Sequence, residues 1–231
     1  WLVIVTALAG GSRLIGAPVP VWIPALGTVA NFLLVVPVVI IGLNLFGTFS
    51  GRYSALAGSV TLRFILLSAL AFIFASVLNL AFSFRGFVEI AQFTLLSELR
   101  DWVVLYACFS AAMFGAAYFI LPRLTSGAWR FPALVKMHLG ATLVGGALLT
   151  VALGVGGWQQ GHLLNTSGVA FGEITQAMTF WFTLRTAGFA VRLFGHLAFA
   201  INFVGLLCAL CACDKKAAAD LGPGSSAEGH A

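Results

Sequence analysis

Charged residues are scarce in this chain. Lys and Arg number 12 and Asp and Glu number 7, so that 8% of the 231 residues are charged and 61% are hydrophobic, whereas about a quarter of the residues in soluble domains are charged. This composition excludes a soluble globular domain and indicates an integral membrane protein. The basic residues stand singly between apolar segments, so the sequence lacks the basic patch that neutralises nucleic-acid phosphates. We therefore expect the lipid bilayer, and no nucleic acid, among its partners.

The sequence also lacks the motifs of the common catalytic sites. Its four cysteines are too few and too poorly placed for a disulfide framework. A nucleotide-binding glycine loop, a nucleophile beside a base and paired inward carboxylates are missing as well. Two histidines that share one haem iron must come from facing helices, and His138 and His162 are expected near opposite membrane faces. His196 is expected to be satisfied inside the protein or at an interface.

Long uncharged runs predict helices that cross a membrane. About 20 apolar residues span the hydrocarbon core, where unpaired backbone groups are costly, so that only helices or closed barrels cross. These runs lack the alternation of barrel strands. The predicted fold is therefore all-α, a polytopic transmembrane bundle over residues 1–213. Five complete spans are expected over 21–46, 62–84, 93–121, 133–157 and 182–212, and residues 1–9 are expected to be a truncated first span that continues a longer segment.

Basic residues predict the orientation of the bundle, because Lys and Arg in short loops favour the cytoplasmic side. One side has Arg13 and Arg85, with Arg100 and Arg185 near its helix ends. The other side is richer in basic residues, and we expect it to be cytoplasmic. The tail, residues 214–231, is rich in Ala, Gly and Ser, and we expect it to be cytoplasmic and disordered. The residues of the richer side are Arg52, Arg63, Arg123, Arg130, Lys136, Lys215 and Lys216.

Ionisable residues at membrane depth are expensive and are therefore candidates for function. Glu98, Arg100 and Asp101 lie close together near the outer end of the third complete span. They predict an interfacial ion cluster, with a proton or substrate path as the alternative. Arg185 and Arg192 lie seven residues apart and share a helix face, so they are expected to meet acidic groups of a partner or lipid head groups.

Small residues predict close helix packing. The chain has 26 glycines, and small residues allow helix backbones to approach each other in lipid. We expect four of these glycines and one asparagine to lie, with Arg185 and Arg192, at an interface with another protein. These five residues are Gly145, Gly146, Gly188, Gly195 and Asn202.

Particular strings carry a more specific signal. They are GSRLIGAPVPVWIP at 11–24, TLRFILLSA at 61–69, the run AQFTLLSELRDWVVLYACFSAAMFGAAYFILPRL at 91–124, GWQQGHLLN at 157–165 and RLFGHLAFAIN at 192–202. In this order they resemble the C-terminal half of the catalytic subunit I of C-type (cbb3) haem-copper cytochrome c oxidases, from the seventh helix to the twelfth. The resemblance is collinear over 1–212. It implies a haem-copper oxidase subunit I-like fold and a bacterial inner membrane.

The sequence departs from this family at the metal ligands. The resemblance places Ser12 and Arg13 where the family has the His-His pair for copper, and Arg100 and Trp102 where the tenth helix has His-x-His for its two haems. Thr6 falls near the active-site tyrosine. Ser is a poor copper ligand, Arg stays protonated and Trp offers only an N–H donor. The resemblance therefore implies a divergent paralogue that lacks the haem and copper ligands.

Large side chains at the former ligand positions suggest how the haem volume is filled, because an empty cavity is destabilising. Arg100 and Trp102 are expected to fill it, with Glu98 or Asp101 neutralising Arg100.

The expected function is that of a redox-inactive accessory or scaffold subunit, a pseudoenzyme in a cbb3-like complex of respiratory electron transport. We expect no catalytic residue, metal or cofactor in this chain. Haem and copper are expected in its partners, a haem-bearing catalytic subunit and cytochrome c subunits. Three alternatives stay open: one half of a split catalytic subunit, a module that uses the former haem pocket for a quinone, a lipid or protons, and an assembly chaperone.

Overall fold

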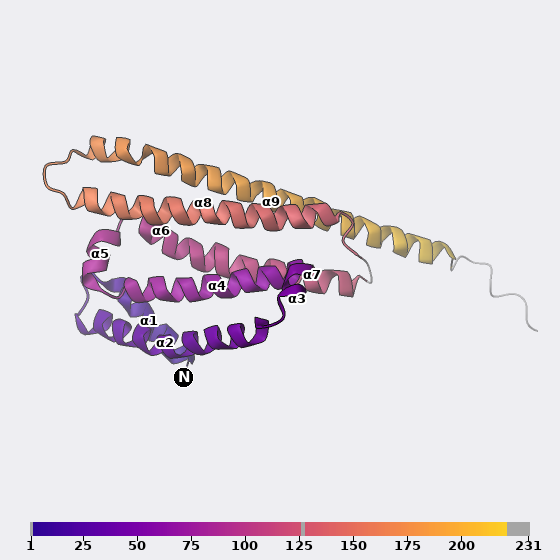
Figure 1. Cartoon of the computed structure of the whole chain (residues 1–231), viewed down its shortest axis with the longest axis horizontal. Coiled ribbons are helices and arrows are strands. Elements are labelled where there is room, and N and C mark those ends of the chain that lie inside the picture. The colour runs from indigo at the N-terminus through magenta and orange to yellow at the C-terminus, as the bar shows by residue number, and fades with distance from the viewer. Residues whose placement is uncertain (1, 126–127, 221–231) are drawn as a thin grey trace, which may run out of the picture.

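The computed structural model describes residues 2–125 and 128–220 (Figure 1). All regular elements in these two segments are helices, which agrees with the predicted all-α fold. The short α1 passes into a 3-10 turn, η1, and the third long helix consists of α6, a π-helical segment η2, and α7. The elements are α1 Leu2–Ala9, η1 Gly10–Leu14, α2 Trp22–Phe49, α3 Tyr53–Gly58, α4 Val60–Ala81, α5 Arg85–Ala91, α6 Leu95–Trp102, η2 Val103–Phe109, α7 Ser110–Leu124, α8 Pro132–Leu164 and α9 Phe171–Asp220.

In the described part of the chain, five helices are long and apolar enough to cross a membrane, as predicted. They are α2, α4, the continuous helix α6–η2–α7, α8 and α9. Helix α8 ends at Leu164 instead of residue 157, and α9 begins at Phe171 instead of residue 182. The extra turns contain polar side chains, two of which form hydrogen bonds within the chain: Gln160 Oε1 accepts the backbone N–H of Leu95 at 2.9 Å, and Gln159 Oε1 accepts the Trp181 indole N–H at 2.7 Å.

The C-terminal tail differs in part from expectation. Helix α9 continues through residue 214, where disorder was expected to begin, as far as Asp220. The rest of that tail, 221–231, lies outside the described residues. At the other end of the chain, α1 and η1 form the short apolar helix that corresponds to the truncated first span.

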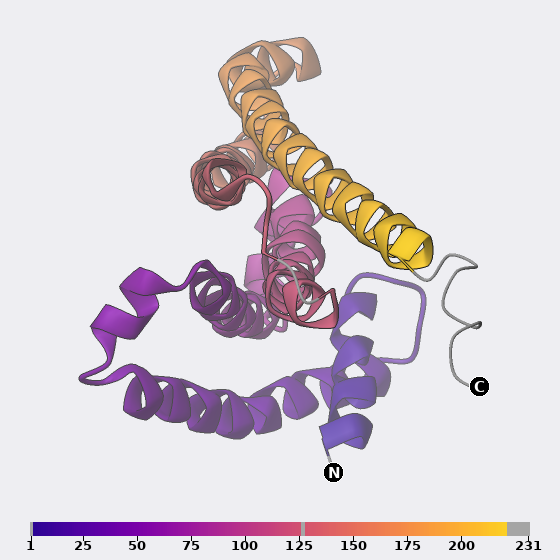
Figure 2. The same cartoon turned by 90° about the vertical axis from the view of Figure 1, so that its right-hand side faces the viewer.

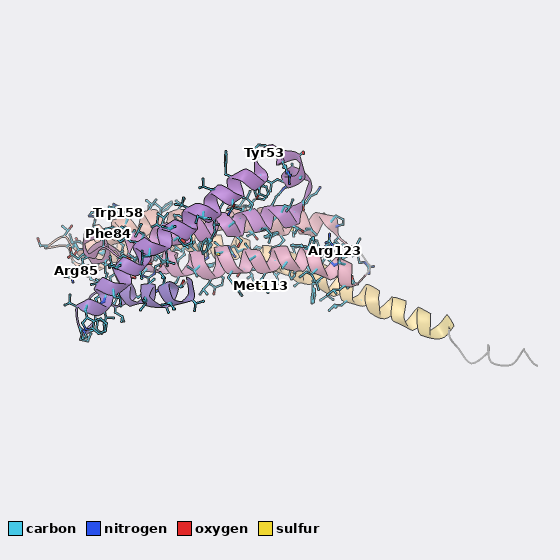
Figure 3. The ribbon with its side chains drawn as sticks, turned by 90° about the horizontal axis from the view of Figure 1, so that it is seen from below. Tyr53, Phe84, Arg85, Met113, Arg123 and Trp158 are labelled. Carbon is cyan, nitrogen blue, oxygen red and sulfur yellow. The ribbon has the colours of Figure 1, made fainter. Side chains whose placement is uncertain are left out.

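The helices lie in three layers. The antiparallel pair α8 and α9 forms one layer, α4 and the helix α6–η2–α7 form the middle one, and α2 with α1 forms the third (Figures 1 and 2). The α8–α9 loop, α5 and η1 lie at one end of the bundle, whereas α3, the end of α7 and the start of α8 lie at the other. Arg85 thus lies toward the opposite end of the bundle from Tyr53 and Arg123 (Figure 3).

Glycines bring α9 against α8. A Cβ added at Gly145 would lie 2.8 Å from the Gly188 carbonyl oxygen, and one added at Gly195 would lie 2.8 Å from the Ala141 Cβ. Asn202 is fully buried and bonds to the backbone of the same chain. These residues were expected to face another protein. They pack inside the chain instead, because the short loop after α8 makes α9 its antiparallel neighbour. Gly146 faces the Trp102 side chain of the middle layer.

The start of α6 is fixed between α5 and α8. Phe93 adopts a positive φ of 62°, and the Thr94 hydroxyl then caps α6 by accepting the Leu96 N–H at 3.2 Å. The α6 backbone lies so close to α8 that a Cβ on Gly157 would be 2.3 Å from the Leu96 nitrogen. A core of buried apolar side chains continues from this contact and supports the residues described next. It includes Leu95, Leu96, Leu99, Trp102, Val103, Leu149, Leu153 and Met178.

Candidate functional site

The π-helical segment η2 lies at the centre of the candidate site. Such segments are rare and often mark functional positions. Three carbonyl groups of η2 accept side-chain hydrogen bonds: Ser110 Oγ donates to Leu105 at 3.0 Å, Ser68 Oγ donates to Cys108 at 2.8 Å, and Arg192 Nη2 donates to Tyr106 at 3.1 Å. Side chains from α4 and α9 thus satisfy backbone groups that are costly to leave unpaired in lipid.

Three of the four positions that the resemblance assigns to metal ligands surround one small cavity. Ser12, Arg13 and Arg100 line a space of about 100 Å³ between η1 and α6. Ser12 is buried, donates its hydroxyl to the Ala9 carbonyl at 2.9 Å and accepts from Asn31 Nδ2 at 2.9 Å. The positions that the resemblance assigns to copper, Ser12 and Arg13, thus lie around the same space as Arg100, which it assigns to a haem.

An ion cluster links η1 to α6. Asp101 Oδ1 lies 3.4 Å from Arg13 Nη2 and 3.5 Å from Arg100 Nε, so that one carboxylate serves two guanidinium groups. The Arg100 guanidinium also lies 4.5 Å from the ring centroid of Phe82. Of the two acidic partners expected for Arg100, the structure thus selects Asp101, and Glu98 pairs elsewhere.

Arg185 and Arg192 of α9 both face the middle layer. Arg185 Nη1 lies 2.7 Å from Glu98 Oε2, and the Arg192 guanidinium lies 5.4 Å from the centroid of the Trp102 ring system. The sequence placed both arginines at a partner or at lipid head groups. Their contacts lie within the chain, because α9 packs over the α6–η2 junction, which the sequence alone does not indicate.

Trp102, the fourth position that the resemblance assigns to a ligand, occupies the other side of α6. It is 4% exposed, and with Arg192 it lines a larger cavity of about 320 Å³ between α4, η2, α8 and α9. The ligand positions predicted from the resemblance are therefore divided between two cavities that α6 separates.

Sequence reasoning missed a buried histidine pair. His138 of α8 is fully buried, and its Nε2 lies 3.3 Å from Nδ1 of His196 on α9. The Tyr118 hydroxyl lies 2.9 Å from His138 Nδ1, so that both ring nitrogens of His138 are engaged. Phe114 packs edge-on against His138 and stacks on His196. The expectation that His196 is satisfied within the protein or at an interface agrees with this contact.

The Glu98–Arg185 pair gives a first testable prediction. Removing either charge leaves the other half-buried and unpaired. The losses of stability caused by Glu98→Gln and by Arg185→Gln should therefore add up to more than the loss in the double variant. We expect a coupling free energy of about 1 to 2 kcal/mol, between that of exposed and buried pairs. A double-mutant cycle in detergent unfolding measures it.

The matched control is Glu173→Gln, because Glu173 is exposed near the start of the same helix. It should leave the free energy of unfolding unchanged. Strictly additive effects of Glu98→Gln and Arg185→Gln would contradict the pairing.

The comparisons with known proteins now identify the family. The family model of Cytochrome C and Quinol oxidase polypeptide I matches residues 1–191. The chain belongs to this oxidase polypeptide I family. No curated protein matches it. Membership, together with five long apolar helices, makes the chain a multi-pass membrane protein related to the oxidase subunit I.

The resemblance implies haem and copper, and the residues at the positions that it assigns to their ligands do not fit either group. Ser12, Arg13, Arg100 and Trp102 offer a hydroxyl, two guanidinium groups and an indole N–H, none of which is a suitable ligand for copper or haem iron. Within residues 2–125 and 128–220, no group of three or more His, Cys, Asp or Glu side chains is arranged to hold a metal ion.

Proposed function

We propose that this chain is a redox-inactive accessory or scaffold subunit of a cbb3-like respiratory oxidase complex. It would pack against a haem-bearing catalytic subunit and cytochrome c subunits in the bacterial inner membrane. The side of the bundle that has the seven basic residues, and the C-terminal tail, would face the cytoplasm. In this function the chain positions its partners and transfers no electrons itself.

One observation carries this proposal: the side chains at the positions that the resemblance assigns to metal ligands contact other residues of the same chain. Ser12 takes part in a buried hydrogen-bond network with Ala9 and Asn31. Arg13 and Arg100 share Asp101. Ser12, Arg13 and Arg100 thus have polar partners in the same chain, as a frame retained without its metals would require, since buried polar groups need new partners. The indole N–H of Trp102 has no hydrogen-bond partner among the described residues.

The exposure of α2 supports a partner. Only 11% of its span is buried within the chain, compared with 39% for α8. The alternative function, one half of a split catalytic subunit, also requires a partner. It has less support, because the missing ligands belong to the half of the fold that this chain supplies.

The test is purification of the full chain in a mild detergent, with haem and copper quantified per polypeptide and bound proteins identified by mass spectrometry. We expect haem to arrive with an oxidase or cytochrome c partner and to leave with that partner when it is stripped. Haem at one or more per isolated chain would overturn the proposal. His138→Gln, measured in parallel, would then show whether the buried histidine pair holds it. Purification with no oxidase partner would overturn the scaffold role.

A further inference from the structure

An apolar groove lies between α2 and α4. It measures about 290 Å³, and its wall is mostly aliphatic. Val39 of α2 and Val77 of α4 lie on this wall and are 52% and 57% exposed, so the groove opens to the surrounding lipid along one side. Figure 2 shows how α2 diverges from α4, to which α3 connects it. The other aliphatic residues of the wall include Leu34, Val38, Ile73 and Leu80.

The groove has the length of one leaflet of the hydrocarbon core. On α2 its wall extends from Asn31 to Gly42, a separation of eleven residues. At 1.5 Å per residue this is about 16 Å, and half of the hydrocarbon core is about 15 Å. An acyl chain that enters at the boundary of the core and ends near the bilayer midplane covers the same distance. A transmembrane helix, about 10 Å wide, would occupy about 1,300 Å³ over this length and is too wide to lie within the groove.

The Asn31 end of the groove lies near the boundary of the core. Thr28 Oγ1 donates to the Ser83 carbonyl at 3.2 Å, whereas Gly42 faces the Ile73 side chain. Helices α2 and α4 are therefore antiparallel here, and the Asn31 end lies beside the last turn of α4. The groove thus runs from the end of α4 toward its middle.

Among the polar side chains of the wall, that of Asn79 is available to a ligand. Ser76 Oγ donates to the Phe72 carbonyl at 2.8 Å, and Asn31 Nδ2 donates to Ser12 Oγ at 2.9 Å. The Asn79 amide lines the groove and forms no hydrogen bond with any described residue. It lies in the last turn of α4, at the depth at which the ester groups of phospholipids meet the hydrocarbon core. It is therefore placed to donate to an ester carbonyl.

A guanidinium group follows at the same end of the bundle. Arg85 stands six residues after Asn79, at the start of α5 (Figure 3). The neighbouring Phe84 ring packs edge-on against Phe32 of α2 at a centroid distance of 5.8 Å, which places the start of α5 beside α2. Arg85 is exposed and forms no ion pair with any described residue, Glu89 of the next turn included. Its guanidinium group is therefore available to a phosphate, which it can bind through two hydrogen bonds.

We propose that this groove binds one phospholipid as a structural lipid. One acyl chain lies between α2 and α4 as far as Gly42, the Asn79 amide donates to an ester carbonyl, and the phosphate pairs with Arg85. The aliphatic wall, the amide and the guanidinium group follow one another along the protein in the order in which acyl chain, ester and phosphate follow one another in the lipid. The proposal concerns lipid binding alone and does not depend on the scaffold role.

The experiment is a titration of the purified full chain in detergent with palmitoyl-oleoyl phosphatidylglycerol, in which native mass spectrometry counts the bound lipids. Gly42→Leu extends a side chain into the groove beside Ile73 and should raise the Kd of the first lipid at least about tenfold, the effect of about two displaced methylene groups. Gly47→Leu is the matched control on the same helix, because a Cβ at Gly47 meets nothing within 4 Å. It should leave this Kd unchanged.

Arg85→Gln tests the head group. Loss of the guanidinium charge should raise the Kd of the phospholipid about fivefold. The same variant should leave the Kd of monopalmitoyl glycerol unchanged, because this molecule has an acyl chain and an ester but no phosphate. Arg52→Gln is the matched control: Arg52 is exposed at the other end of α2, and its loss should leave both Kd values unchanged.

Circular dichroism and size-exclusion chromatography establish that each variant is folded before its Kd is compared. Equal Kd values for Gly42→Leu, Gly47→Leu and the unmodified chain would overturn the proposal, as would a first lipid that binds no more tightly than later ones. Equal effects of Arg85→Gln on phospholipid and monopalmitoyl glycerol would overturn the assignment of the phosphate. A co-purifying protein that is lost in Gly42→Leu, with the lipid Kd unchanged, would assign the groove to that protein instead. The haem measurement above fails or succeeds independently of these results.

Discussion

Replacing Gly157 with alanine is expected to lower the free energy of unfolding by about 3 kcal/mol, at the upper end of the usual cost of overpacking. The added Cβ would lie 2.3 Å from the Leu96 nitrogen and 2.8 Å from the Leu95 carbonyl carbon, which are backbone atoms and cannot rotate away. Either α6 separates from α8 or the capped start of α6 is deformed. Equilibrium unfolding in mixed detergent micelles, followed by far-ultraviolet circular dichroism, measures the loss.

Gly154→Ala provides the matched control three residues earlier on α8. A Cβ there would meet only the Leu99 Cδ2, at the ordinary contact distance of 3.5 Å. Because alanine favours helix over glycine by about 1 kcal/mol, this variant should be as stable as the unmodified chain or slightly more stable. Similar stabilities for Gly154→Ala and Gly157→Ala would contradict the close contact of α6 with α8.

Asn202→Leu is expected to destabilise the protein by about 1 to 3 kcal/mol, because it leaves the Phe131 N–H without a partner in a low-dielectric environment, whereas the Phe131 carbonyl still accepts the Leu134 N–H. Asn202 is fully buried on α9. Its Oδ1 accepts the Phe131 N–H and its Nδ2 donates to the Phe131 carbonyl, each at 3.1 Å. Phe131 is the residue before Pro132, at which α8 begins. The asparagine thus attaches the start of α8 to α9, and detergent unfolding measures its contribution.

The control for this substitution is Asn44→Leu. Asn44 lies on α2 and is exposed, so leucine should be tolerated there. If Asn202→Leu were as stable as Asn44→Leu, the two hydrogen bonds to Phe131 would contribute nothing to the folded state.

The fold was largely predictable because hydropathy reports directly on membrane spans. An uncharged run of the necessary length has few alternatives to a helix in lipid, and all five complete spans were confirmed. The helix ends were less predictable. Gln159 and Gln160 signal the edge of the hydrocarbon by their polarity. Both nevertheless lie within α8, because the Trp181 indole N–H of α9 donates to Gln159 and the Leu95 backbone N–H of α6 donates to Gln160. The π-helical segment η2 left no signal that periodicity can detect.

The candidate site was predictable only where its contacts are local. Arg100 and Asp101 are neighbours in sequence, and their pairing follows from that. The Glu98–Arg185 pair depends on how α9 packs over α6, which one sequence does not specify. The His138–His196 contact did leave a signal. His138 lies 26 residues before the end of α8 and His196 lies 25 residues after the start of α9, so an antiparallel hairpin brings them to the same level.

The π-helical segment also determines how this helix must be aligned with related sequences. A π turn takes up more residues than an α turn, so side chains after Phe109 point in directions that an unbroken α-helix would give to neighbouring positions. Trp102 and Tyr118 therefore cannot be assigned to faces by a single helical wheel. Suppose that the chain is aligned without a gap through 103–109 with a relative whose helix is regular there. One half of the helix is then shifted by one residue, and the alignment compares side chains that face different neighbours.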